Sequence, residues 1–148
     1  MNKDILNRTI ERLNEKDLSC IVMDIKGNIK FEEKGIGIKP LMTHLRLDKH
    51  AFKDLCIIDT VVGKAAALMS ILGEAVYVHG IVMSETAMKI LDEKGIPYSY
   101  DNKVPFIHNR TETGMCPMEE TVKDIDDPSL AFMCLEETIK RLMSGKTR

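Results

Sequence analysis

Hydrophobic residues recur at helical spacing near the start of the chain, with charged and amide side chains between them. These hydrophobic positions are Ile5, Leu6, Ile10 and Leu13. Their spacing predicts an amphipathic helix over residues 4–16. Two short segments, 18–24 and 28–33, then flank a connection that contains Gly27, and this pattern predicts a β-hairpin.

Strand and helix patterns alternate through the middle of the chain. The predicted segments, in order, are a strand at 55–58, a helix at 61–72, a strand at 75–79, a helix at 84–93 and a strand at 96–100. This alternation is typical of parallel strands joined by right-handed helical crossovers. A helix at 40–47 precedes it, and Cys116 and Asp127 each begin a further helix. We therefore expect an α/β fold, a three-layer α/β/α sandwich around a five-stranded mixed sheet.

The composition fits one domain and limits the classes of partner. The 148 residues, 44% of them apolar, are enough for one buried core, so we expect a single domain over residues 1–148. Lys and Arg number 21 against 23 Asp and Glu, which leaves no broad positive field for binding nucleic acid. Aromatic residues are 5% of the chain, so few side chains are available to stack on successive bases. Extended nucleic-acid binding is therefore not expected.

The placement of apolar residues and cysteines predicts a cytoplasmic protein that does not contact a membrane. The first residues are charged and lack the continuous apolar segment of a signal peptide. The most apolar stretch, 65–78, is interrupted by polar residues and is shorter than the roughly 20 residues that span a bilayer. The four cysteines lie far apart, without the spacing of a disulfide framework, and are interpreted as reduced thiols: Cys20, Cys56, Cys116 and Cys134. All except Cys116 lie in apolar patterns and are expected to be buried and inert.

The first candidate site lies where the strand at 55–58 meets the helix at 61–72. Gly63 and Lys64 resemble the end of a phosphate-binding P-loop, but the earlier Gly and the following Ser or Thr of that motif are absent. We expect Asp59 to cap the helix or to orient Lys64, and the free N–H groups of the first turn to attract an anion together with Lys64. A tightly packed helix with a solvated lysine is an equally open interpretation.

The second candidate site lies in residues 108–119. Cys116 is expected at the N-cap of a short helix, where the N–H groups and the helix dipole favour a reactive thiolate. His108 and Arg110 lie in the preceding polar loop and could reach the same pocket. Two alternatives stay open: Glu119 can bond back to the cap as in a capping box, and Cys116 can be a small residue that only packs.

The two segments, in this order, resemble motifs of the cytidine-deaminase-like superfamily and, within it, the family known as domain of unknown function 1893. The first segment is 59–67 and the second is 114–120. The resemblance covers nearly the whole chain, because the expected order of helices and strands is also that of the deaminase fold. It implies a pocket where the starts of the two helices converge.

The residues that would bind zinc in this superfamily are replaced. In zinc deaminases the first motif supplies a His or Cys ligand and a proton-shuttling Glu, and a Pro-Cys-x-x-Cys motif supplies two more ligands. Here Val62 and Lys64 stand at the positions of the first ligand and the acid, and Glu119 stands at that of the second cysteine. Catalytic zinc needs three protein ligands, so we expect no metal, no other cofactor and no ordinary deamination.

The resemblance leaves three functions open. In the first, the chain binds a small nucleotide-like or otherwise anionic molecule, with Cys116 as nucleophile or covalent anchor and Lys64 as its electrostatic partner. In the second, it is a catalytically inactive ligand sensor or interaction module. In the third, it is an atypical deaminase whose missing ligands come from His108 or another subunit. In the first reading Asp59 completes the catalytic set, and the ligand-binding residues are Gly63, His108, Arg110 and Glu119. Whether the chain works alone or as a homo-oligomer stays open.

Overall fold

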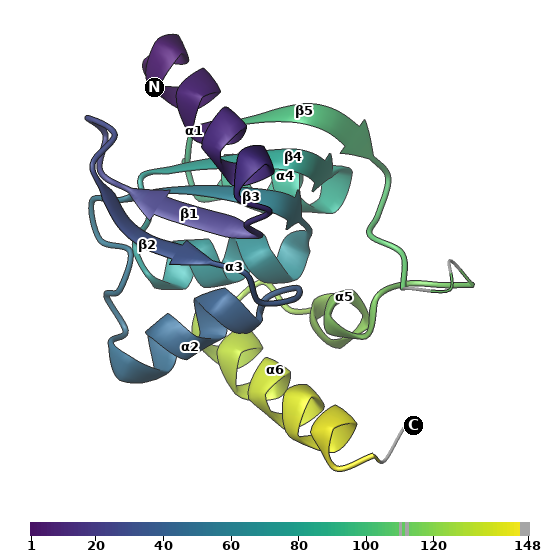
Figure 1. Cartoon of the computed structure of the whole chain (residues 1–148). Helices are drawn as coiled ribbons and strands as arrows, with labels where there is room; N and C mark the ends of the chain where they lie inside the picture. The colour runs from purple at the N-terminus through teal and green to yellow at the C-terminus, as the bar shows by residue number, and fades with distance from the viewer. Residues whose placement is uncertain (110, 112, 146–148) are drawn as a thin grey trace.

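A five-stranded mixed sheet forms the centre of the structure (Figure 1). The structure is a computed structural model in which residues 1–109, 111 and 113–145 are described. The strands, in the spatial order β2-β1-β3-β4-β5, are β2 (Ile29–Glu33), β1 (Cys20–Met23), β3 (Cys56–Val62), β4 (Tyr77–Ser84) and β5 (Tyr98–Val104). β1 is antiparallel to both β2 and β3, whereas β3, β4 and β5 are parallel. The predicted mixed sheet, a hairpin joined to a parallel portion, is confirmed.

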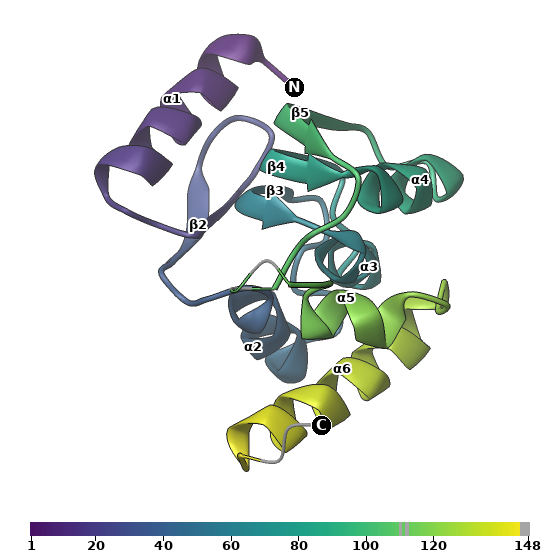
Figure 2. The ribbon, with the colours of Figure 1, turned by 90° about the vertical axis from the view of Figure 1, so that its right-hand side faces the viewer.

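Helices lie on both faces of this sheet (Figures 1 and 2). The described residues form α1 (Lys3–Glu15), α2 (Lys39–Leu47), α3 (Lys64–Leu72), α4 (Glu85–Glu93), α5 (Pro117–Val122) and α6 (Pro128–Met143). α1 covers one face, and α3 and α4 cover the other. α2, α5 and α6 then pack against α3 on its far side. None of the described helices is both long and apolar enough to cross a bilayer.

α3 is largely buried, because the sheet and four helices, α2, α4, α5 and α6, surround it. Its side chains from Ala65 to Met69 are at most 3% exposed. The small alanines of its first turns allow its neighbours to come close, and Leu68 fills the space between the sheet and the outer helices. The opposite face of the sheet has a smaller core of its own, in which Leu13 of α1 packs near Ile58 of β3. Of the two open interpretations, the tightly packed helix is what the sequence forms, but its lysine is not solvated, since the Lys64 side chain is 12% exposed and paired with Asp126.

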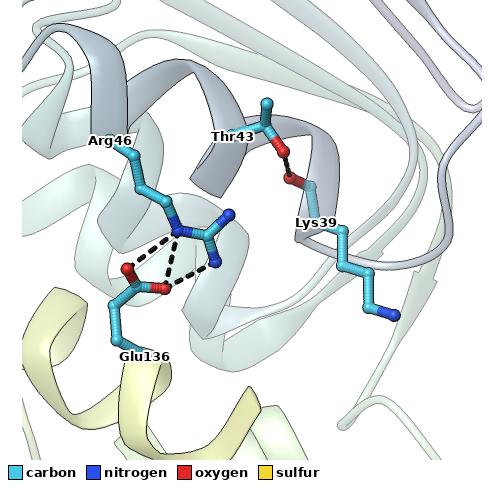
Figure 3. A network of polar contacts seen from close by, with 4 residues as sticks. All are labelled: Lys39, Thr43, Arg46 and Glu136. Atoms are coloured by element: carbon cyan, nitrogen blue, oxygen red, sulfur yellow. Dashed lines mark hydrogen bonds and ion pairs between the residues drawn. The ribbon is translucent and has the colours of Figure 1, made fainter. Parts of the chain in front are cut away.

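Two polar contacts hold the outer helices in place and so position α5. Arg46 of α2 donates to both carboxylate oxygens of Glu136 of α6, with Nη2 2.6 Å from Oε1 and Nε 2.8 Å from Oε2 (Figure 3). These charge-assisted hydrogen bonds lower the pKa of the Glu136 carboxyl. The second contact joins α5 to α6: Oγ1 of Thr121 lies 2.7 Å from Oγ1 of Thr138. α6 therefore connects α2 to the short helix that carries the second motif.

The boundary between β3 and α3 differs from the sequence prediction. We expected the strand to end at residue 58 and Asp59 to cap a helix that starts at 61, but β3 continues to Val62 and Gly63 is the N-cap. Asp59 pairs with Cys20 of β1 and with Gly80 of β4, inside the sheet. The β-branched residues that follow Asp59 suit the pleated strand better than a helical turn, and the antiparallel and parallel neighbours supply their hydrogen bonds. The prediction that Asp59 caps α3 was wrong.

Candidate functional site

The N-terminus of α3 already holds an anion, and it comes from the chain itself. The two carboxylate oxygens of Glu119 accept hydrogen bonds from the backbone N–H groups of Lys64, at 2.7 Å, and Ala65, at 2.8 Å. A carboxylate at this point satisfies two unpaired donors of the helix and lies at the positive end of its dipole. Glu119 thus does not form the capping box that the sequence left open as an alternative, but caps α3, whose first residue lies 55 positions earlier.

Burial of Glu119 sets the electrostatics at this junction. Glu119 is only 6% exposed, and this burial raises the pKa of its carboxyl group. The hydrogen bonds from the N–H groups of Ala65 and Lys64 act in the opposite direction and lower it. Gly63 makes the contact possible, because a Cβ at this position would lie 2.5 Å from Cδ of Glu119. The two sequence motifs are therefore joined directly at the helix start.

The side chain of Lys64 is paired with the segment that follows α5. Its ammonium group lies 2.8 Å from Oδ1 of Asp126 and donates to the backbone carbonyl of Lys123 at 3.1 Å, both in the segment after α5. Among the described residues it forms no hydrogen bond to Cys116. The charge of Lys64 lowers the pKa of Asp126, chiefly through their hydrogen bond. Lys64 thus closes one side of the junction instead of activating the thiol.

Asp59 is the most perturbed carboxyl group that the structure describes. It is 4% exposed on β3, and burial raises its pKa to about 7, with weaker opposing hydrogen bonds from Val61 and Thr60. The N–H of Val61 lies 3.4 Å from Oδ1 of Asp59. A carboxyl group with such a pKa can exchange a proton near neutrality, which is a common property of functional groups. It forms no contact with Lys64, so the expected orienting role is not supported.

Cys116 takes the position that its sequence context predicts. It is the N-cap of α5, with Pro117 as the first helical residue, and its side chain is partly exposed, whereas Cys20 and Cys56 are buried. The backbone N–H of Cys116 donates to the carbonyl of Ile107 at 3.0 Å, which fixes the start of the helix. Cys134, expected to be buried, is also partly exposed on α6.

The loop before Cys116 folds back on itself. His108 forms an isolated antiparallel bridge with Met115, and its ring lies 4.6 Å from that of Phe106, centroid to centroid. This pairing places Phe106 and Met115 beside α4 but leaves His108 outside the lining of the pocket described next. Arg110, the other loop residue predicted to bind a ligand, lies outside the described residues.

A pocket of about 170 Å³ opens next to the α3–α5 junction. Its floor and walls come from α4, from the start of α3 and from the segment between β5 and α6. The lining residues are Lys64, Thr86, Lys89, Ile90, Glu93, Phe106, Met115, Glu119, Lys123 and Asp126. Two of the predicted site residues, Lys64 and Glu119, are among them. Asp59, Gly63 and Cys116 do not line it, so the expected shared pocket of both motifs forms only in part.

Most charges of this pocket are paired within the chain. Glu119 is held by N–H groups, Lys64 by Asp126, and Lys123 lies 3.3 Å from Glu120. Lys89 of α4 forms no ion pair with any described residue, and its charge contributes to the lowered pKa of Asp126. It lies in the same wall as the apolar side chains of the pocket.

Sequence reasoning missed Lys89 and Phe106. Both lie outside the two motifs, on a helix and in a loop whose residues show no special spacing. Their common position follows only from the parallel crossover, which brings α4 beside the loop after β5 (Figure 2). An amphipathic pattern finds the buried face of α4, but it does not tell which exposed lysine faces a pocket.

The junction does not fit the zinc ion that the superfamily resemblance implies. The carboxylate of Glu119 uses both oxygens on backbone N–H groups, and an ammonium group, that of Lys64, starts the helix. In the part of the chain that the structure describes, no three His, Cys, Asp or Glu side chains gather as metal ligands. We therefore derive no step through a metal.

The fold and the site define an α/β protein with a small pocket, lined by charged and apolar side chains, next to the point where two helix starts meet. Residues 8–139 match the family described as domain of unknown function DUF1893, also named TM1506, so the chain belongs to that family. It is similar to the crystal structure, at 2.70 Å resolution, of the DUF1893 family protein TM1506 from Thermotoga maritima. The identity is 31%, the TM-score is 0.83, and the match covers 93% of this chain and 91% of that chain. A comparison with curated proteins finds no match.

Proposed function

We propose that this chain binds a small anionic molecule in the pocket between α3, α4 and the loop after β5. The proposed class of ligand is nucleotide-like, with a planar ring and a phosphate. The observation that carries the proposal is the position of Lys89, which has no ion pair among the described residues and lines the same pocket as Phe106, Ile90 and Met115. A cation next to an aromatic and two aliphatic side chains suits a ligand with one charged end and one apolar ring.

The electrostatics of the pocket support an anion. Asp126, one of the lining residues, has a lowered pKa, caused first by Lys64 and then by the charges of Lys89 and Lys94, so these cations lie close to its carboxylate. Glu119, which also lines the pocket, is buried, and both of its carboxylate oxygens already accept from N–H groups. A ligand phosphate would therefore meet Lys89 without displacing an existing ion pair. The volume of about 170 Å³ favours a ligand with a single ring.

This proposal includes descent from a deaminase-like ancestor. The support is positional: the helices that carry the two motifs meet through Glu119 and Gly63, at the place where the resemblance puts the pocket. The chain keeps the arrangement of helices but fills the junction with its own carboxylate. Of the functions left open by the sequence, ligand binding without zinc chemistry has the most support, and the chain then acts as a sensor or carrier of the ligand.

The test is a titration with cytidine 5′-monophosphate, followed by isothermal calorimetry and by the melting temperature. Cytidine and inorganic phosphate serve as separate probes of the ring and of the anion. We expect the nucleotide to bind more tightly than either part, and Lys89→Gln to weaken it by about tenfold or more, the effect of losing one charge-assisted contact. Lys53→Gln, an exposed lysine outside the pocket, is the matched control. Equal loss in both variants, or no binding by any of the three probes, would contradict the proposal.

A second candidate gives Cys116 a covalent role toward the same ligand. Cys116 is partly exposed at the start of α5 and follows Met115, which lines the pocket. In this version the thiol adds across an activated carbon–carbon double bond of a ligand held by Lys89: the S–C bond forms, the π bond breaks, and the thiol proton goes to the neighbouring carbon. Lys64 does not act on the thiol because it is paired with Asp126. Intact mass spectrometry of the freshly purified protein tests it: an adduct that is absent from Cys116→Ser supports the anchor, and an unmodified mass in both proteins contradicts it.

A further inference from the structure

A chain of polar side chains crosses from β4 to β5 at the far edge of the sheet. Tyr77 and His79 on β4 face Ser99 and Asp101 on β5, and all four lie on the face that α1 partly covers, since alternate residues of a strand share one face. The hydroxyl of Tyr77 donates to Oγ of Ser99 at 2.6 Å. Nδ1 of His79 lies 2.6 Å from the same Oγ, and Nε2 of His79 lies 3.4 Å from Oδ1 of Asp101.

Burial and charge determine where the imidazole carries its proton. The His79 side chain is 3% exposed, and its Nε2 is the one buried side-chain polar atom without a hydrogen-bond partner among the described residues. Nε2 faces a carboxylate, so a proton on Nε2 is favoured over a lone pair there. Nδ1 then accepts, and Ser99, which already accepts from Tyr77, donates its own proton to His79. Burial lowers the pKa of His79, although the charge of Asp101 acts in the opposite direction. The lowered pKa keeps the ring neutral, so that it can accept a proton.

We propose that Ser99 is a nucleophile activated by His79, with Asp101 as the positioning residue, and that it reacts with small activated acyl esters or thioesters. In the reaction Oγ of Ser99 attacks the acyl carbon, the Oγ–C bond forms, and the bond from that carbon to the leaving group breaks. The proton of Ser99 passes to Nδ1 of His79 and from there to the leaving group. Water then hydrolyses the acyl-serine to a carboxylic acid and free Ser99.

The serine cluster is open to solvent and separate from the pocket of the proposed function. Ser99 is partly exposed and Asp101 is 44% exposed, so the group opens to solvent at the edge strand β5. Neither residue lines the pocket of the proposed function. The two sites lie on opposite faces of the sheet, because Tyr77 packs against the α1 core whereas the pocket lies beside α3 and α4. The serine site is therefore independent of ligand binding in that pocket.

A small fluorophosphonate is the probe, because its reaction with an activated serine forms an Oγ–P bond and releases fluoride. Peptide mass spectrometry compares Ser99 with Ser129, an exposed serine at the start of α6, within the same folded molecule. We expect Ser99 to be labelled at least about tenfold faster than Ser129. This factor is a modest part of the rate acceleration that a positioned general base supplies. Equal labelling of the two serines overturns the proposal without any variant.

Substitutions separate an activated serine from a merely structural one. His79→Gln should reduce labelling of Ser99 to the rate of Ser129, because an amide cannot accept the proton. Asp101→Asn should lower the rate several-fold and Asp101→Glu should restore it, while both proteins keep the wild-type melting temperature at this exposed edge. If His79→Gln fails to fold, the two variants of Asp101 provide the test. Equal labelling rates in Asp101→Asn and Asp101→Glu would overturn the role of Asp101, and with it the proposed activation of Ser99.

Discussion

Asp59→Asn should stabilise the protein at alkaline pH and leave its stability almost unchanged at acid pH. Burial raises the pKa of Asp59 from 3.8 to about 7. The folded chain therefore holds this proton more tightly than the unfolded chain does, and the resulting stability is present below about pH 4 and is lost as pH rises through about 7. This difference in pKa between the two states corresponds to about 4 kcal/mol in the free energy of unfolding. An amide stays neutral, and its Oδ1 can still accept from the N–H of Val61.

The assay is urea unfolding of both proteins between about pH 4 and 8, with the free energy of unfolding extrapolated to water. We expect the two proteins to agree near pH 4 and the Asp59→Asn variant to become more stable than wild type by up to about 4 kcal/mol near pH 8. Asp124→Asn, at an exposed position, removes one negative charge without changing a buried group and controls for net charge. A difference between wild type and Asp59→Asn that stays constant with pH would refute the assignment of a buried, high-pKa carboxyl group.

Three further predictions concern the junction of α3 and α5. Glu119→Ala should lower the free energy of unfolding by about 3 kcal/mol or more, because two N–H groups at the start of α3 lose a charged acceptor. The control Glu120→Ala should change the free energy of unfolding by less than about 1 kcal/mol, and urea unfolding measures both variants. Gly63→Ala should lower the stability by about 2 kcal/mol or more through its 2.5 Å approach to Glu119, and Gly114→Ala, with nothing within 4 Å, should not. Cys116 should be alkylated by iodoacetamide before the two buried cysteines, as peptide mass spectrometry at several times can show, and equal rates would contradict its exposure.

The fold could be predicted where a pattern and its cause are local. The helix over 4–16 matches α1, and the helix over 84–93 matches α4, whose N-cap is Ser84, with its Oγ accepting from the N–H of Ala87 at 3.1 Å. The mixed sheet follows from a hairpin next to alternating strands and helices, because crossover rules leave few other arrangements. The element types were therefore readable from periodicity and caps.

The errors arose where a distant partner decides the outcome. Asp59 looked like a helix cap because its partners in the sheet, Cys20 and Gly80, are far away in sequence. Glu119 looked like a local capping residue because the N–H groups that it accepts from lie about 55 residues earlier in the sequence. Lys89 carried no local signal at all. The start of α5 was predictable from sequence, whereas the start of α3 and the carboxylate that caps it were not.

The most direct test of the proposed function is an amide NMR titration of the labelled protein with cytidine 5′-monophosphate. Binding in the pocket predicts saturating chemical-shift changes at Lys89, Ile90, Phe106 and Met115, with the amides of α1, on the other face of the sheet, unchanged. The same titration of Lys89→Gln should need about tenfold more nucleotide to reach saturation. Shifts confined to residues outside the pocket, or no saturable shift in the wild-type protein, would contradict the account.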